Sequence, residues 1–185
     1  MKSSSKTKYA LLGILTIKPM SGYDIKKMID SSISHFWSES FGQLYPALKQ
    51  MVSENLLTTF EEINGKKPKI IYTITEKGKL VLKEWLAISP DKEQIRIEPL
   101  LKIFFGYNTT IEITENHITE LKINFQQKLI VLKEIVRNME VYKTPTNEYI
   151  FPLLTAQYGI YTYEANLKWC NYALDMLLKL KKGEL

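Results

Sequence analysis

The hydrophobic period of the sequence changes near residue 57, and this change restricts the fold more than any other feature. Before it, residues 40–54 repeat apolar side chains at the spacing of a helix. After it, residues 58–63 and 69–74 alternate as two β-strands, and the Asn64-Gly65 pair between them favours a tight hairpin turn. The sequence therefore predicts a short helix followed directly by a β-hairpin.

The elements on either side complete a recognisable order. Residues 5–17 are predicted to form a first helix, and Ser21-Gly22-Tyr23-Asp24 has the form of a capping box that starts a second helix, ending near Asp30. Thr75 is predicted to cap a fourth helix that ends near Ile88. The order helix, helix, helix, strand, strand, helix predicts a winged helix-turn-helix.

The third helix separates into two faces on a helical wheel. Leu44, Leu48 and Met51 share the apolar face, whereas the other face is small, polar or basic. A helix that enters the major groove of DNA needs such a face near its N-terminal end, where Gln43 could pair bidentately with adenine. An ordinary amphipathic helix with a solvated face has the same pattern. We expect base contacts from three residues: Gln43, Tyr45 and Lys49.

Pro46 lies inside this helix, where it removes one backbone donor and crowds the carbonyl four residues earlier. That carbonyl belongs to Gly42. We therefore expect Gly42 to be the reason that the proline is tolerated.

The predicted hairpin carries lysines where a wing would meet the phosphate backbone or the minor groove. Residues 1–89 contain 13 lysines and 8 acidic residues, a net charge of +5, whereas residues 90–185 contain 12 basic and 12 acidic residues. The excess positive charge lies only in the half that carries the hairpin, which favours a polyanionic partner for that half. Helix starts add backbone amides that bind phosphate. The expected phosphate-contacting residues are Ser21, Gly22, Tyr23, Ser40, Lys66, Lys67 and Lys69.

The second half is predicted to be helical and to begin at residue 90, after a first domain of residues 1–89. A short helix is expected at 99–107, and two long helices at 114–142 and 152–182, with Pro145 between them. Two antiparallel helices of this length have few partners in their own chain, so we expect a homodimer. The alternative is a two-helix flap packed on the first domain. The residues expected at the dimer interface are Leu121, Phe125, Leu132, Leu154, Tyr158, Tyr161, Trp169, Tyr172 and Met176.

Several kinds of function find no support in the sequence. The two histidines, His35 and His117, and the single Cys170 show no metal-ligand spacing, and no glycine-rich phosphate loop or nucleophile motif is present. We expect no enzyme activity, no metal and no cofactor. The apolar run at residues 9–15 is too short to span a bilayer and is followed by Lys18-Pro19, so a cytoplasmic protein without a membrane partner is expected.

Two further interpretations stay open. Tyr158, Tyr161, Tyr163, Trp169 and Tyr172 could line a pocket for a small aromatic effector, or they could belong to a dimer core. A winged helix can also serve as a protein-interaction module without sequence-specific DNA binding. Binding that weakens steeply with salt would distinguish DNA contact from that alternative.

Five segments of the first domain follow one another in a specific order and spacing: Tyr9-Ala10-Leu11-Leu12-Gly13-Ile14-Leu15, Ser21-Gly22-Tyr23-Asp24-Ile25, Phe36-Trp37, Gly42-Gln43-Leu44-Tyr45-Pro46-Ala47-Leu48 and Tyr72-Thr73-Ile74-Thr75-Glu76-Lys77-Gly78. On these segments the first domain resembles a known family, the PadR-like transcriptional regulators. The resemblance implies a homodimeric regulator, usually a repressor, in which the helix with Tyr45 reads an inverted repeat and the hairpin acts as the wing. The second half resembles the larger subgroup, whose two long C-terminal helices dimerise. The family commonly has arginine near the wing, whereas this chain has lysine, which cannot form a bidentate fork.

Overall fold

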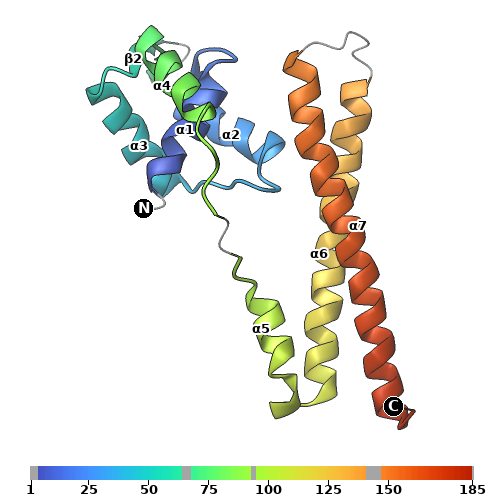
Figure 1. The fold of residues 1–185 in the computed structure, drawn as a ribbon. Coiled ribbons are helices and arrows are strands. Elements are labelled where there is room, and N and C mark those ends of the chain that lie inside the picture. The colour runs from blue at the N-terminus through green and yellow to red at the C-terminus, as the bar shows by residue number, and fades with distance from the viewer. Residues whose placement is uncertain (1–3, 64–67, 93–94, 141–146, 185) are drawn as a thin grey trace. The chain divides into compact units, whose positions relative to one another are not determined.

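The chain divides into two compact units in the computed structural model (Figure 1), which describes residues 4–63, 68–92, 95–140 and 147–184. The first unit is Met1–Lys92 and the second is Glu93–Leu185. The boundary lies close to the one expected after residue 89. A separate role for each unit stays a prediction.

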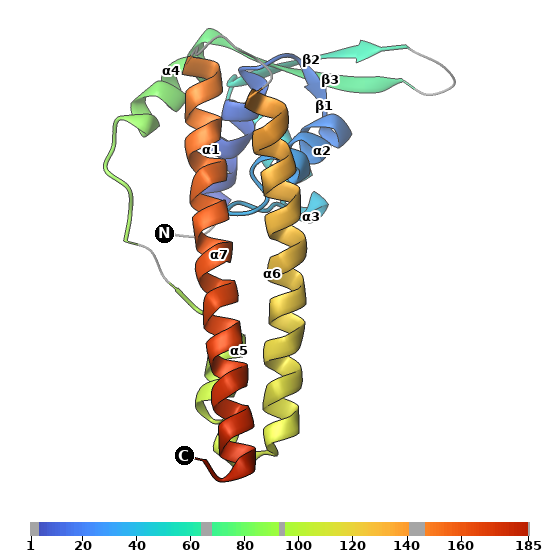
Figure 2. The ribbon, with the colours of Figure 1, turned by 90° about the vertical axis from the view of Figure 1, so that its right-hand side faces the viewer.

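The first unit combines four helices with a small antiparallel sheet in the part of the chain that the structure describes. Its strand order is β1-β3-β2, and the β2–β3 ribbon extends from the helical part of the unit (Figure 2). The strand β1 was not predicted, because two residues are too few to show a period of two. The elements are α1 (Ser4–Leu15), β1 (Met20–Ser21), α2 (Gly22–Ser32), α3 (Phe41–Ser53), β2 (Leu57–Glu62), β3 (Lys69–Ile74) and α4 (Glu76–Leu86).

The helix starts follow from local side-chain chemistry. Ser21 caps α2 by accepting a hydrogen bond from the backbone N–H of Asp24, and Thr75 caps α4 by accepting one from Gly78. Thr75 also donates its hydroxyl hydrogen toward the carbonyl oxygens of Asn55 and Leu56, at 2.9 and 3.0 Å. This hydroxyl therefore ties the start of α4 to the end of α3.

The core of the first unit lies between α1, α2, α3 and the sheet. Leu44, Leu48 and Met51 of α3 are buried in it, which confirms the apolar face predicted for this helix. In α4, Val81 and Leu82 pack against the core, whereas Leu80 is exposed. The other buried members of the core are Leu11, Leu12, Ile14, Leu15, Met20, Ile25, Ile29, Leu56 and Leu57.

The second unit contains α5 (Glu98–Phe104), a 3₁₀ turn at Gly106–Asn108, and the long helices α6 (Ile111–Glu140) and α7 (Asn147–Lys182), which run antiparallel (Figure 1). The expected start of α7 at Pro152 was wrong, because the helix begins five residues earlier and includes the proline. As the sixth residue of α7, this proline removes one backbone hydrogen bond and crowds the carbonyl four residues earlier, but the helix continues through it. Pro145 lies outside the described residues.

The seam between α6 and α7 is built from one face of each helix. Leu132 and Val136 of α6 pack against Ala156, Ile160 and Tyr163 of α7. Leu132 therefore packs within its own chain, and this corrects the dimer-interface role expected for the residue. Phe125 also packs against this seam, with its ring centroid 5.9 Å from that of Tyr163.

A second apolar face of α7 is exposed. Tyr161 and the buried Cys170 are nine residues apart, or about 2.5 turns, so they lie on opposite sides of the helix. The side of α7 that carries Tyr161 does not pack against α6, and the tyrosines on this side are more than 60% exposed. We call it the α7 stripe: Leu154, Tyr158, Tyr161 and Tyr172.

Burial separates Tyr163 from the other tyrosines that were expected to line an aromatic pocket. Its side chain lies in the seam, and this burial raises the pKa of its hydroxyl. Tyr163 therefore belongs to the intrachain core, and this corrects its grouping with Tyr158, Tyr161 and Tyr172. Trp169 and Met176, at the edge of the α7 stripe, are partly buried.

Candidate nucleic-acid interface

The outer face of α3 is exposed and polar. Gln43, Pro46, Lys49 and Gln50 all lie on it, on the side opposite the buried leucines. Gln50 donates a hydrogen bond to Glu54, at 2.7 Å, which occupies the end of this face near the helix C-terminus. The N-terminal half of α3 is therefore the part best able to approach another molecule.

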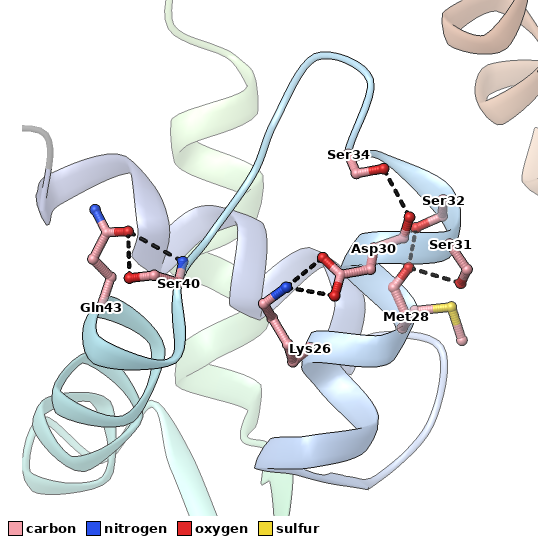
Figure 3. A network of polar contacts seen from close by, with 8 residues as sticks. All are labelled: Lys26, Met28, Asp30, Ser31, Ser32, Ser34, Ser40 and Gln43. Atoms are coloured by element: carbon pink, nitrogen blue, oxygen red, sulfur yellow. Dashed lines mark hydrogen bonds and ion pairs between the residues drawn. The ribbon is translucent and has the colours of Figure 1, made fainter. Parts of the chain in front are cut away.

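The start of α3 is held by a capping box between Ser40 and Gln43. Two donors of Ser40 point at the same side-chain oxygen of Gln43: the backbone N–H at 3.2 Å and the hydroxyl at 2.9 Å (Figure 3). The backbone N–H of Gln43 donates in turn to the carbonyl of Ser40, at 3.1 Å. Both side chains are exposed, and the hydrogen bonds of the cap use some of the polar atoms of each.

Gly42 and Pro46 lie four residues apart, about one turn, near the start of α3. A Cβ placed on Gly42 would come within 4 Å of one neighbouring atom only, the hydroxyl oxygen of Ser40, at 3.8 Å. The proline ring is therefore clear of a side chain at residue 42. The crowding expected from the proline concerns the carbonyl of Gly42, so the role of this glycine stays a prediction. Pro46 is the sixth residue of α3, where it removes one backbone hydrogen bond and crowds that carbonyl.

The side chain of Tyr45 is partly packed against its neighbours and partly exposed. Its ring lies over Gly22 at the start of α2, and a Cβ on that glycine would be 2.6 Å from Cε1 of the tyrosine. The ring also stacks on Phe41 with a centroid distance of 6.1 Å. About half of the side chain remains exposed. Its hydroxyl lies near Tyr72, whose pKa is raised by burial and, to a smaller extent, by Tyr45.

Replacing Gly22 with alanine is expected to weaken DNA binding more than folding. The new methyl group would collide with the edge of the Tyr45 ring, which can rotate away, so the free energy of unfolding should fall by only about 1 kcal/mol. The displaced ring would then lose its position on the outer face of α3. Thermal denaturation and a DNA-binding titration on the same variant measure the two effects. A large loss of stability with normal binding by the folded fraction would contradict this role for Gly22.

The start of α2 presents fewer groups than the sequence suggested. Ser21 and Gly22 are buried, because Ser21 pairs with Ile71 in the sheet and Gly22 lies beneath Tyr45. Tyr23 is 60% exposed. A phosphate contact at this helix start would therefore depend mainly on Tyr23.

The lysine at the base of the hairpin has a partner that the sequence did not indicate. Lys69 Nζ lies 3.3 Å from Oδ2 of Asp24, which also accepts a hydrogen bond from the hydroxyl of Ser21 at 2.6 Å. The bond from Ser21 lowers the pKa of Asp24 most, and Lys69 lowers it further. Asp24 and Lys69 are 45 residues apart, so no local pattern could have revealed the pair. Lys66 and Lys67 lie outside the described residues.

Other kinds of site find no support in the described residues. No group of three or more histidine, cysteine, aspartate or glutamate side chains is placed there to hold a metal ion. Among the described helices, none combines the length and apolar content needed to cross a bilayer.

Two family models match the chain on either side of the unit boundary. Residues 11–84 match the transcriptional regulator PadR-like family, and residues 95–177 match the family described as virulence activator alpha C-term. The first match contains α2, α3 and the hairpin. The second contains most of the helical unit.

Individual relatives agree with these matches. The negative transcriptional regulator PadR of Bacillus subtilis is 39% identical over 100 residues, which are 53% of this chain and 55% of the relative. The chain thus spans about half the length of the curated relatives it matches. The crystal structure of B. subtilis PadR in complex with operator DNA has a TM-score of 0.80 and 28% identity, and covers 91% of this chain and 96% of that chain.

Two other solved structures are similar over most of their length. B. subtilis PadR in complex with p-coumaric acid has a TM-score of 0.71 and 25% identity, with 96% and 98% of the two chains covered. The protein smu.1604c from Streptococcus mutans UA159 has a TM-score of 0.78 and 30% identity, with 95% and 99% covered. The family matches on both units and the likeness to PadR over nearly the whole fold lead to one conclusion: the chain belongs to the PadR-like family of transcriptional regulators.

Proposed function

We propose that this protein is a sequence-specific DNA-binding transcriptional regulator that represses as a homodimer on an inverted repeat. The observation that carries the proposal is the exposed polar face of α3 beside the β2–β3 hairpin, in the half of the chain that holds all the excess positive charge. A related protein with the same fold, B. subtilis PadR, has been solved with operator DNA. The family consists of transcriptional regulators, which are not enzymes, and we propose no catalytic role for this member.

Within the first unit, α3 and the β2–β3 hairpin would contact different parts of the DNA. The N-terminal half of α3 would enter the major groove, with Gln43, Tyr45 and Lys49 toward the bases. The hairpin would follow the backbone, with Lys66, Lys67 and Lys69 near phosphates. Lys69 would exchange its contact with Asp24 for a phosphate, whereas Ser40 supports the start of α3.

The second unit would join two copies. The α7 stripe is apolar and exposed along one side of a long helix, and burying it against a second copy would remove that surface from water. Two α3 helices held by such a dimer would meet half-sites about one turn of DNA apart or a small multiple of that distance.

Control by a small aromatic molecule is part of this proposal. B. subtilis PadR has been solved in complex with p-coumaric acid. A ligand of that class combines an aromatic ring with polar ends, which suits tyrosine-rich surfaces. The protein would act in the cytoplasm, where its DNA partner is found.

Replacing Lys67 with alanine is expected to weaken binding to all DNA sequences alike. One phosphate contact would be lost, so the slope of log affinity against log salt concentration should become shallower by about one. Lys182→Ala, a change of equal charge on an exposed residue at the C-terminal end of α7 and outside the α7 stripe, serves as the control and should leave the slope unchanged. Measurements at several salt concentrations test both. Binding by the wild-type protein that does not depend on salt would contradict the function and would favour a protein-interaction module.

A further inference from the structure

Gln43 is held at the start of α3 by two hydrogen bonds that end on one atom. The backbone N–H and the hydroxyl of Ser40 both donate to Oε1 of Gln43, at 3.2 and 2.9 Å. A backbone N–H can only donate, so the side-chain atom that faces it must be the oxygen. This fixes the orientation of the amide. Its nitrogen, Nε2, lies on the side away from Ser40, on a side chain that is exposed to solvent (Figure 3).

The cap changes what Gln43 can present to a base. Oε1 has two lone pairs, and the two donors of Ser40 use both. Nε2 still offers two N–H groups and no acceptor. In this arrangement the side chain is a pure hydrogen-bond donor toward any molecule that approaches the outer face of α3.

The bases differ in how well they match such a donor. Adenine presents one acceptor, N7, and one donor, N6, in the major groove, so bidentate pairing with glutamine requires a free Oε1. Guanine presents two acceptors, O6 and N7, which the two N–H groups of Nε2 can serve together. Thymine offers one acceptor, and cytosine offers a donor, which Nε2 would meet unfavourably. A capped glutamine therefore matches guanine best.

Breaking the cap to read adenine would cost stability at the helix start. Loss of an N-terminal cap shifts a folding equilibrium by a factor of about five. That factor is comparable with the lower end of the discrimination that one bidentate base contact supplies. An adenine contact at that lower end would thus lose most of its advantage in releasing Ser40.

We propose that Gln43 reads a guanine in each operator half-site, as a donor through Nε2, while Ser40 holds its oxygen at the start of α3. The proposal rests on the DNA-binding function proposed above and names the base that this residue selects. It replaces the adenine contact expected from the sequence. Ser40 acts as a positioning residue, because it determines which atom of Gln43 faces the groove.

The test compares all four bases at every position of a half-site that the wild-type protein binds. At one position the wild type should prefer guanine over adenine by about ten-fold. Gln43→Ala and Gln43→Glu should both lose that preference and keep the others. Glutamate retains an acceptor for Ser40 but has no donor, so its thermal denaturation should match that of the wild type. Because glutamate also repels phosphate, ratios between bases are compared rather than affinities.

Ser40→Ala provides a second variant that keeps Gln43. Without the hydroxyl, one lone pair of Oε1 becomes free to accept a hydrogen bond from N6 of adenine. The ratio of guanine to adenine binding should then fall several-fold at the same position and stay constant elsewhere.

Two results would overturn the proposal while leaving the DNA-binding function intact. One is a preference for adenine, thymine or cytosine at the position that responds to Gln43→Ala. The other is an equal loss on every sequence, which would make Gln43 a phosphate contact. A wild-type protein without base preference at any position would instead contradict the function on which the proposal rests.

Discussion

Gly78→Ala should unfold the first unit of the chain or leave it barely stable. Gly78 lies in the first turn of α4, and a Cβ there would collide with the carbonyl oxygen of Leu56 and come within 2.9 Å of a side-chain carbon of Ile74. The carbonyl belongs to the backbone between α3 and β2, so no side-chain rotation can make room. We expect the free energy of unfolding to fall by about 3 kcal/mol, a large part of the total for a unit of this size. Thermal denaturation followed by circular dichroism measures the loss.

Gly13→Ala is the matched control for this substitution. Gly13 lies inside α1, and no heavy atom falls within 4 Å of a Cβ built there. Alanine is the better helix former, so this change should raise the free energy of unfolding by about 0.5–1 kcal/mol. If Gly78→Ala melts at the wild-type temperature, the packing of α4 against the corner between α3 and β2 is wrong.

Tyr172→Glu is expected to separate the proposed dimer and to reduce operator binding strongly. Tyr172 belongs to the α7 stripe and is 63% exposed in the single chain, so a charge there should not disturb the seam with α6. In a dimer the carboxylate would be placed among the apolar side chains of the α7 stripe, where burying a charge is costly. The mass in solution should fall to that of one chain, 21.6 kDa. Loss of the link between two DNA-binding units should weaken operator binding by about 100-fold or more.

Asn171→Glu controls for charge at the neighbouring position. Asn171 is also exposed, but it lies about 100° around the helix from Tyr172 and outside the α7 stripe. This variant should keep the mass and the operator affinity of the wild type. Sedimentation or light scattering, with DNA titration at low salt, tests both variants. A dimeric Tyr172→Glu protein would place the interface on another surface.

Local patterns predicted much of the first unit. The period of 3.6 residues identified Leu44, Leu48 and Met51 as core, and the spacing from Ser40 to Gln43 identified the cap of α3, because both depend on residues within a few turns. The sequence did not show which atoms of Ser40 and Gln43 form the hydrogen bonds of this cap. The second donor of Ser40 on Oε1 of Gln43 depends on a hydroxyl orientation that spacing alone does not determine.

Contacts between distant segments could not be predicted from one sequence. The close approach of Tyr45 to Gly22 and the pair between Lys69 and Asp24 arise only when α2, α3 and β3 pack together. The same limit applies to the packing of α7 against α6. An apolar period marks its faces, but it does not reveal which face meets α6, and Leu132 was therefore assigned to an interface although it packs within the chain.

Selection of bound fragments from random double-stranded DNA tests the central claim most directly. The full chain at low salt should enrich an inverted repeat, with two identical half-sites whose centres lie about one helical turn apart or a small multiple of that distance. Such a result would require two α3 helices related by symmetry and a second unit that joins the copies. Fragments without a shared sequence, or a single half-site without its inverted copy, would contradict the account.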